Sequence, residues 1–574
     1  MTDDVPAPDD PAALVRASAD VGLLDVAEAD ADRVELDGDE EDTSPYAAGT
    51  FAKVGSGMAV LVALVAAPYA APDLDAKLAR SVGVCSEPEP GVAADDCSFA
   101  RAWLPGEPVP FWNVIGRELM GEGAVEEEAA AQVEETQELA AALLDRDDTD
   151  VPLPDKVIVT PPTDGTTDAP PPYTPHEDDG LEVPRALELP SGDALDPFFA
   201  ALARSDIGYE GAITRVSQWG DSVMSADNVT SALRTSMQRR FGDAGHGFHL
   251  LAPPNNSYRH RGIRFKTSEW QHCYIINKCK PDAHFGFGGT TVWSGGGAQS
   301  VYRTVQDAAF GRSWSRAELW YAEQPAGGKI RLDLDGGEPT FVQTRGEALT
   351  DRWFTLAMED GPHRLKVKAA GEGRVRMHGI VFERDVPGVV WDGMEQLGAF
   401  TSRMMYFDEA HLRAQVEHRD PDLLVFMFGG NDLTLSARNV ARYEDIWKDA
   451  LERFRGPADG VDGVPARPCL LIAPVDHGKR KGQQIISDPA VAEIVSRQRR
   501  AALAAGCAFF DTPAAMGGEG AAGRWRKADK PLMAGDLAHL THAGQKVIGH
   551  YVYLALMAEY VAYRARSPGA SPSP

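Results

Sequence analysis

Val216-Ser-Gln-Trp-Gly-Asp-Ser-Val223 is the stretch on which the interpretation of this chain depends. Apolar residues at Ile213 and Val216 lead into Gly220-Asp221-Ser222, and further apolar residues recur at four-residue spacing from Val229 to Phe241. This pattern predicts a strand, a tight turn and a helix. The Ser222 hydroxyl would then lie at the carboxyl edge of a sheet, beside the unpaired N–H groups of a helix amino terminus. Taken alone, Gly-Asp-Ser is equally typical of an ordinary turn and helix cap.

Two later stretches place polar residues at comparable positions. The continuous apolar run Leu423–Phe428 indicates a strand that is covered on both faces, and it ends in Gly429-Gly-Asn-Asp432. Near the C-terminus, Gly535-Asp-Leu-Ala-His-Leu-Thr-His-Ala-Gly544 opens the final predicted helix. Asp536 and His539 are three residues apart in this stretch. That spacing lets the carboxylate orient the imidazole while the other ring nitrogen faces a serine.

The region after residue 385 alternates between strand-like and helical stretches. Apolar runs at Leu423–Phe428, Cys469–Ala473 and Cys507–Phe510 are separated by helical stretches at Ala441–Phe454 and Pro489–Ala505. Such alternation predicts a parallel sheet with helices on both faces.

Residues 300–385 have a different pattern, with apolar and polar residues alternating between Gly- and Asp-rich turns, and we expect an antiparallel β-sandwich. Asp333, Asp335 and Glu338 are candidates for calcium binding, although a hairpin turn is the favoured interpretation. Four aromatic residues could stack on sugar rings or form the core: Trp314, Trp320, Tyr321 and Trp353.

The N-terminal third differs in composition from the rest. Residues 1–52 are predicted to be an acidic, disordered tail, and 53–72 a candidate signal-anchor transmembrane helix, with a buried helix or a late signal peptide as alternatives. Residues 73–147 are expected to form a small extracytoplasmic or helical segment, and 148–188 a linker rich in Pro, Thr and Asp. Residues 566–574 are expected to be a disordered tail.

Charge and cysteine content limit the partners of the protein. The chain has 56 basic and 86 acidic residues, which opposes nonspecific binding to nucleic acid. Cys85 with Cys97, and Cys273 with Cys279, could each close a short loop, whereas the apolar runs at Cys469 and Cys507 favour buried free thiols. No pair has zinc-finger spacing and no His-Glu-x-x-His motif is present, so we predict no metal and no cofactor.

Together the motifs resemble a known superfamily. Gly220-Asp221-Ser222, Gly429-Gly-Asn431-Asp432 and Asp536-Leu-Ala-His539-Leu-Thr resemble blocks I, III and V of the SGNH/GDSL hydrolases, in that order. The segments Arg239–Phe248 and Gly388–Ala399 further resemble the peptidoglycan O-acetylesterase group, in which a carbohydrate-binding-like β-sandwich is inserted between the serine and asparagine blocks. The resemblance covers about residues 190–565.

This resemblance implies a fold with a flavodoxin-like parallel sheet flanked by helices. Residues 189–299 and 386–565 would form the two parts of the hydrolase domain, with the β-sandwich of residues 300–385 inserted between them.

The resemblance also implies roles for five residues. Ser222 would be the nucleophile and His539 its general base, oriented by Asp536. The N–H groups of Ser222 and Gly398 and the side chain of Asn431 would form the oxyanion hole. Three neighbours are expected to lie outside the catalytic set: Asp432 as a structural cap, His477 in a loop, and His542. The residues after the serine, Val223-Met224, differ from the group, which often has His or Leu directly after the serine. This difference changes the wall of the pocket, so the motifs do not identify the substrate.

The predicted function is therefore a serine esterase of the bacterial cell envelope that removes O-acetyl groups from a glycan, with peptidoglycan favoured. The catalytic domain would be periplasmic, and the inner membrane would be a partner through the N-terminal anchor. Two alternatives are an O-acetyltransferase acting on an envelope polysaccharide, with the same triad, and a non-enzymatic glycan-binding protein. A lipase is less favoured because the sequence contains no long apolar lid.

Overall fold

The computed structural model describes residues 143–144, 153, 155–161, 173–277, 279–280, 282–457, 460, 466–482 and 484–566. The predicted acidic tail, the candidate membrane span, nearly all of 73–147 and the pair Cys85 and Cys97 lie outside these residues. Among the described helices, none combines the length and the hydropathy that a membrane span requires.

A five-stranded parallel sheet forms the centre of the predicted hydrolase domain, with the strand order β13-β1-β14-β15-β18. Counted along the chain this order is 2-1-3-4-5, which is the flavodoxin-like arrangement. The predicted fold class is thus confirmed. The strands are β1 (Ile213–Gly220), β13 (Gly388–Glu395), β14 (Leu423–Met427), β15 (Cys469–Ile472) and β18 (Ala508–Phe510).

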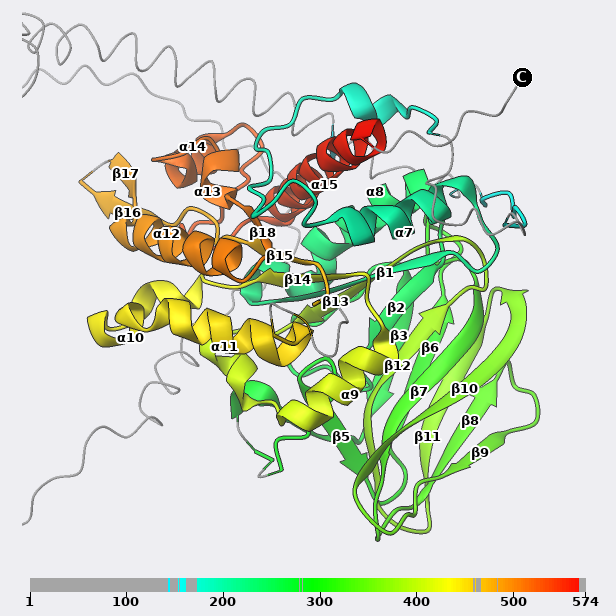
Figure 1. The fold of residues 1–574 in the computed structure, drawn as a ribbon. Coiled ribbons are helices and arrows are strands. Elements are labelled where there is room, and N and C mark those ends of the chain that lie inside the picture. The colour runs from blue at the N-terminus through cyan, green and yellow to red at the C-terminus, as the bar shows by residue number, and fades with distance from the viewer. Residues whose placement is uncertain are drawn as a thin grey trace, which may run out of the picture. The chain divides into compact units, whose positions relative to one another are not determined.

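Helices cover both faces of this sheet (Figure 1). Leu423, Val425 and Met427 pack on one side of β14, and Leu424 and Phe426 on the other, because successive side chains of a strand point to opposite faces. One layer contains α7 (Asp196–Ile207), α8 (Asn228–Phe241) and α15 (His542–Arg566), and the other α9 (Glu409–Arg419), α11 (Tyr443–Arg455) and α12 (Pro489–Ala504).

Short elements complete the hydrolase domain. They are α10 (Ala437–Ala441), α13 (Thr512–Ala515), α14 (Ala521–Lys527), the hairpin β16 (Gly478–Lys481) and β17 (Gln484–Ser487), and the 3-10 segments η1 (Glu177–Gly180), η2 (Ser222–Asp227), η3 (Ile275–Asn277), η4 (Thr401–Tyr406) and η5 (Asn431–Thr434).

Two antiparallel sheets lie between β1 and β13 in the chain and share one apolar core. The first has the order β10-β7-β12-β5-β4, with β2 also paired to β12, and the second the order β3-β6-β11-β8-β9. The strands are β2 (Gly245–His249), β3 (Ile263–Ser268), β4 (Gln271–Tyr274), β5 (Thr290–Ser294), β6 (Gln299–Thr304), β7 (Trp314–Glu323), β8 (Lys329–Leu334), β9 (Thr340–Gln343), β10 (Thr350–Gly361), β11 (Arg364–Gly371) and β12 (Val375–Glu383).

The sandwich therefore begins before residue 300, where the sequence pattern placed its start, because β2 to β5 already belong to its first sheet or pair with its second. Glycine-rich turns interrupt the alternation in this stretch, which hid the strands.

Three of the four aromatic residues that we considered for sugar stacking are core residues, and Trp353 is partly buried. Trp314 and Trp320 are fully buried and Tyr321 is buried, while the Trp353 ring is stacked 3.9 Å from the His418 ring of α9. Burial leaves Trp314, Trp320 and Tyr321 no ring face for a sugar, and Trp353 already stacks on His418. The prediction that the sandwich holds glycan stays a prediction, without these aromatics as its basis.

The acidic turn at Asp335 is a hairpin between β8 and β9, so the favoured interpretation is confirmed. Cations and N–H groups already occupy its carboxylates. Asp333 pairs with Arg331 and Lys366, and Asp335 accepts the Arg364 N–H.

The described part of the stretch 148–188, predicted to be a linker, lies against the hydrolase domain. Val159 exchanges backbone hydrogen bonds with the turn at Gly208 and Glu210, and Asp179 forms an ion pair with Arg240 at 2.7 Å. The buried Leu187 belongs to the core below α15. The described part of this segment is therefore extended, and it is held against the domain by backbone hydrogen bonds, an ion pair and apolar packing.

The two cysteine pairs of the described region both form disulfides. Cys273–Cys279 was predicted as a loop closure and is confirmed. The prediction of free thiols at Cys469 and Cys507 is wrong, because these residues are disulfide-bonded. The reason is register: Leu470 of β15 is paired with Ala508 of β18, so the preceding cysteines are adjacent across the sheet.

A buried ion cluster joins the sandwich to the hydrolase sheet. The Arg419 side chain is only 4% exposed; its Nε and Nη2 donate to Asp392 of β13 at 2.8 and 2.9 Å, and its Nη1 to Glu383 of β12 at 2.5 Å. Burial raises the pKa of Glu383, but the guanidinium groups of Arg419 and Arg215 outweigh it and hold that pKa well below its usual range. The Glu383 carboxylate therefore stays ionised, and each buried charge of this cluster is stabilised by its partner of opposite sign.

We expect Arg419→Met to lower the free energy of unfolding by about 3–5 kcal/mol, because it leaves the buried Asp392 carboxylate without its cation, while Glu383 keeps Arg215 and Arg316. Chemical denaturation of both proteins measures this difference. Arg413→Met on the same helix is the control, since Arg413 is a third exposed and pairs at the surface with Glu409, and it should cost about 1 kcal/mol or less. A loss of stability in Arg419→Met no larger than in the control would contradict the assignment.

Candidate active site

The turn after β1 places Ser222 at the carboxyl edge of the parallel sheet. Gly220, the last residue of β1, accepts a hydrogen bond from the Gln396 N–H, and the Asp221 N–H donates to the Met427 carbonyl. A Cβ on Gly220 would lie 2.6 Å from that same carbonyl oxygen, so no larger residue fits. The chain leaves the sheet here between β13 and β14, where the strand order reverses, and such switch points are the usual ligand-binding positions of open α/β sheets.

The predicted helix does not begin at Ser222. A 3-10 segment, η2, follows the serine, and Ala226 and Asp227 have left-handed φ angles of 60° and 59°, so regular helix begins only at Asn228. The Asp221 carboxylate accepts the Val223 N–H, and the Glu395 carboxylate accepts the Ala226 N–H. The amino terminus of α8 is thus displaced from the hydroxyl, contrary to the expectation.

The structure brings the three predicted triad residues together. Ser222 Oγ lies 3.0 Å from His539 Nε2, and His539 Nδ1 lies 2.7 Å from Asp536 Oδ2. The other Asp536 oxygen accepts the N–H groups of Ala538 and His539, which fixes the carboxylate in the turn before α15. The side chains of His539 and Asp536 are 50% and 53% exposed, so solvent reaches the site.

The contact between His539 and Asp536 sets the protonation states in the hydrogen-bonded series Ser222–His539–Asp536. That hydrogen bond raises the pKa of His539 above its ordinary value, against the opposing effect of burial, and it holds the pKa of Asp536 well below its usual range. Asp221, which is almost fully buried beneath the serine, has its pKa raised to about 6 by burial. An ionised Asp536 next to a neutral His539 is the state in which the histidine can accept the Ser222 proton.

The predicted oxyanion residues meet at the same sheet edge. Asn431 begins η5 directly after β14, and its Nδ2 donates to the Ala399 carbonyl at 3.0 Å. Gly398 has a φ of +78° in the turn that the Ala399 N–H closes on Gln396. One hydrogen of the Asn431 amide is used in this contact, and an amide nitrogen carries a second hydrogen that can serve a ligand.

Three neighbouring polar residues are placed as follows. Asp432 is buried and accepts hydrogen bonds from the Thr401 N–H and the Tyr443 hydroxyl. His542 is exposed as the first residue of α15. His477 follows β15 in a loop, as predicted, but its ring approaches the site: a Cβ on Gly430 would lie 3.6 Å from its Nε2, and burial lowers its pKa to about 4. Its position at the carboxyl end of a parallel strand was the available signal.

Two comparisons with known proteins bear on the family and the fold. Residues 394–547 match the model of the GDSL-like Lipase/Acylhydrolase family. Among solved structures, the chain is similar to one described as "Peptidoglycan O-acetylesterase in action, 5 min", with 20% identity, a TM-score of 0.55, and coverage of 66% of this chain and 99% of that chain. A search of curated proteins gave no match.

Two further solved structures align with low TM-scores, which carry no argument. A family two carbohydrate esterase from Cellvibrio japonicus has 11% identity and a TM-score of 0.21, covering 52% of this chain and 99% of that chain. A salicylyl-acyltransferase from a tetracycline biosynthetic pathway has 9% identity and a TM-score of 0.23, covering 53% and 95%.

The family match over residues 394–547 and the fold support the SGNH hydrolase superfamily that the three motifs predicted. This segment is similar to GDSL-like lipases and acylhydrolases. The matched segment contains Gly398, Asn431, Asp536 and His539, while Ser222 lies before the sandwich.

Replacing Asp536 with asparagine tests the electrostatics of the row. Activity should rise with pH as His539 loses its proton, and the raised pKa of His539 sets where this rise occurs. Asp536→Asn keeps an oxygen acceptor but loses the charge that stabilises the imidazolium, so the rise should move to lower pH. The maximal rate should also fall about 10³- to 10⁴-fold. The measurement is kcat/KM for p-nitrophenyl acetate against pH; a midpoint that stays or moves upward would refute the assignment.

Proposed function

We propose that the protein is a serine esterase that removes O-acetyl groups from an envelope glycan, with peptidoglycan as the favoured substrate. The observation that carries the proposal is the continuous hydrogen-bonded row from Ser222 through His539 to Asp536. A relic site in a glycan-binding protein would not need to keep these distances.

The chemistry follows from the geometry. Neutral His539 takes the proton of Ser222 Oγ as the oxygen attacks the ester carbonyl. The carbonyl oxygen becomes negative and faces the N–H groups of Ser222 and Gly398 and the Asn431 amide. The glycan oxygen leaves with the proton from His539, which gives an acetyl-Ser222 enzyme and a free glycan hydroxyl. Water, deprotonated by His539, then releases acetate and restores the serine.

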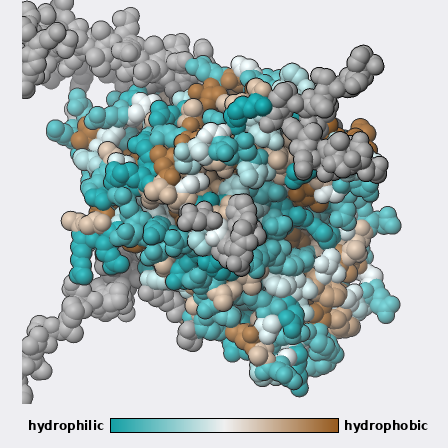
Figure 2. Space-filling view, viewed as in Figure 1, coloured by the Kyte–Doolittle hydropathy of each residue, from teal (hydrophilic) through white to brown (hydrophobic). Residues whose placement is uncertain are grey.

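Two features of the described surface support a glycan ester over a lipid ester. The half-exposed His539 and Asp536 leave the site open to a polymer and to water. The exposed large apolar residues of the described region are Val157, Ile158, Val159, Leu181 and Phe341, and the face in Figure 2 is mostly hydrophilic with small apolar patches. The solved structure with a TM-score of 0.55 is named as a peptidoglycan O-acetylesterase, which makes peptidoglycan the first substrate to test.

The test measures acetate release from O-acetylated peptidoglycan beside other acetylated polysaccharides, with and without an acceptor glycan. We expect release without acceptor, fastest on peptidoglycan, and a loss of about 10⁴- to 10⁶-fold in Ser222→Ala and His539→Ala. His542→Ala is the matched control and should keep most activity. Turnover only with an acceptor would establish a transferase instead, and near-normal activity in folded Ser222→Ala would reject the nucleophile.

We also propose that the protein belongs to the bacterial cell envelope, with residues 1–52 in the cytoplasm and the hydrolase in the periplasm. The uncharged stretch Val54–Pro72 and the disulfides of the described domain support this location, because disulfides persist in oxidising compartments.

Protease added to intact spheroplasts should therefore digest the hydrolase domain, because that domain lies outside the inner membrane. The readout is an immunoblot for the domain before and after lysis, with a cytoplasmic protein as the control. Digestion only after lysis would reject the proposed topology.

A further inference from the structure

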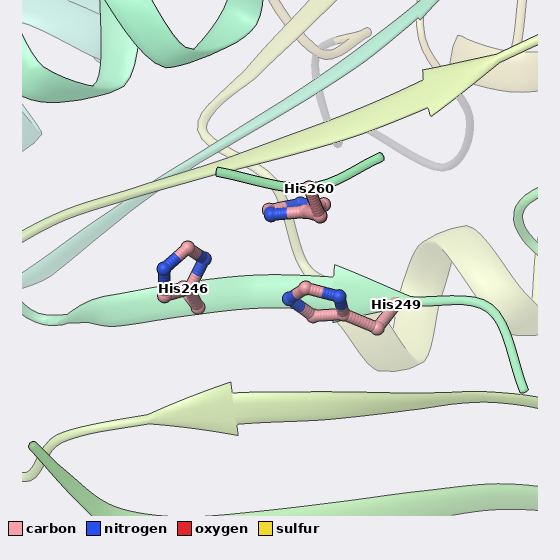
Figure 3. A group of neighbouring side chains, drawn as sticks. All are labelled: His246, His249 and His260. Carbon is pink, nitrogen blue, oxygen red and sulfur yellow. The ribbon is translucent and has the colours of Figure 1, made fainter. Parts of the chain in front are cut away.

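Three buried histidines come together beside Asp227, the last residue of η2. His246 and His249 lie on β2, and His260 lies in the loop before β3 (Figure 3). One ring nitrogen from each residue lies within 4.8 Å of the others. The rings of His249 and His260 are 3.8 Å apart between centroids, and the rings of His246 and His260 are 5.0 Å apart. All three side chains are buried.

The backbone of β2 is shaped to bring two of these rings to one place. Residues three apart on a regular strand point to opposite faces. Here Gly245 and Gly247 have φ angles of 116° and 82°, and the register of β2 against β12 shifts at Gly245. A Cβ on Gly247 would lie 2.2 Å from Asp392 Oδ1, so the position also excludes a side chain. The glycines thus allow His246 and His249 to converge.

Four ring nitrogens of the cluster have no hydrogen-bond partner of normal geometry within the described part of the chain, although the backbone of Gly262 contacts His246 and that of Arg261 contacts His260. His246 lacks such a partner at both nitrogens, His249 at Nε2 and His260 at Nδ1. Buried polar groups are normally paired, so this concentration of unpaired nitrogens is unusual. Burial lowers the pKa of His246 to about 3, and the same cause lowers those of His249 and His260 well below the ordinary value. Neutral imidazoles have a free lone pair.

The charges around the cluster are balanced. Arg234 forms two contacts of 3.1 Å with Asp227, so its charge is neutralised. His260 lies against this pair, with Nδ1 3.6 Å from Asp227 and Nε2 3.5 Å from Arg234. Asp227 beside Nδ1 would orient the His260 ring, as carboxylates commonly do for metal-binding histidines, and Nε2 would bind the metal in place of its contact with Arg234.

A cavity adjoins the cluster on one side. Its volume is about 350 Å³, and it is lined by His249 and His260 together with residues that include Tyr258 and Thr267. It offers both an entry path and room for a water molecule.

We propose that His246, His249 and His260 form a binding site for a divalent transition-metal ion, with Zn²⁺ the best fit and a water from the cavity as the fourth ligand. Zinc prefers tetrahedral nitrogen ligands at about 2.0–2.1 Å, which places the nitrogens roughly 3.4 Å apart. Small side-chain rotations bring the observed set to that distance. The site is separate from the triad, but Asp227 connects it to η2, so a bound ion would stiffen the support of Ser222.

A second candidate group, His284, Asp351 and His411, differs in a decisive way. His411 already uses both nitrogens, accepting the Gly286 N–H at Nε2 and contacting Asp351 at 2.7 Å through Nδ1. The His411 ring therefore has no free nitrogen for a metal ion, and a substitution at His411 can serve as the control.

The experiment titrates Zn²⁺ and Co²⁺ into untagged full-length protein that has been treated with chelator and kept oxidised. The His539→Ala background removes the exposed His539–Asp536 pair as a competing site. We expect about one bound ion per chain by elemental analysis, a visible absorption band of tetrahedral Co²⁺, and a Tm that rises roughly 2–5 °C with saturating zinc. His249→Gln and His246→Gln should lose all three effects, and His411→Gln should keep them.

X-ray absorption of the zinc-loaded protein without histidine-cluster substitutions decides the matter if those variants fail to fold. Scattering from three imidazoles supports the proposal. Absence of binding, fewer than three imidazoles around the ion, or binding that persists in folded His249→Gln would overturn it. Because the readouts are binding and unfolding, their failure is distinct from a failure to release acetate.

Discussion

The arrangement of the site depends on two hydrogen bonds that the buried Asp221 carboxylate accepts. One of its oxygens accepts the Val223 N–H in the turn after β1, and the other accepts the Gly430 N–H at 3.1 Å in the turn after β14. A single side chain thus joins the two loops that carry Ser222 and Asn431. Burial raises its pKa to about 6 despite these bonds, which shows that desolvation exceeds their effect. The desolvation of this carboxylate is unfavourable, but its two hydrogen bonds hold the loops after β1 and β14 in a fixed position relative to each other.

Buried charged groups also connect the sandwich to the parallel sheet that carries the site. The chain leaves the sheet after β1 and returns at β13, and Asp392 in the middle of β13 contacts both Ser217 of β1 and Arg419 of α9. Glu383 at the end of β12 shares Arg419. The point at which the chain re-enters the sheet is therefore fixed within the interior, and β13 carries the chain from there to the Gly398 turn. An insertion of this size leaves the oxyanion residues in place because its ends are tied by ion pairs.

Much of the fold and the site could be predicted from local sequence. Continuous apolar runs such as Leu423–Phe428 identified the buried parallel strands, because strands covered on both faces have no polar side. Polar residues directly after such runs must lie at one edge of the sheet, so Ser222 and Asn431 were brought together by topology alone. Asp536 and His539 were found because their contact is local, and only their approach to Ser222 required the fold.

The features that were missed arise from tertiary pairing that no local pattern records. Cys469 and Cys507 meet through sheet register, and His246, His249 and His260 converge through two left-handed glycines and a bulge.

The irregular backbone at Ala226 and Asp227 has the most direct consequence for the chemistry. Because regular helix begins only at Asn228, α8 does not supply the dipole that we expected behind the serine. The donors available to a developing oxyanion then come from the loops after β1, β13 and β14. Stabilisation of charge in this site is therefore a property of the sheet edge, where three strand ends converge, rather than of one helix terminus.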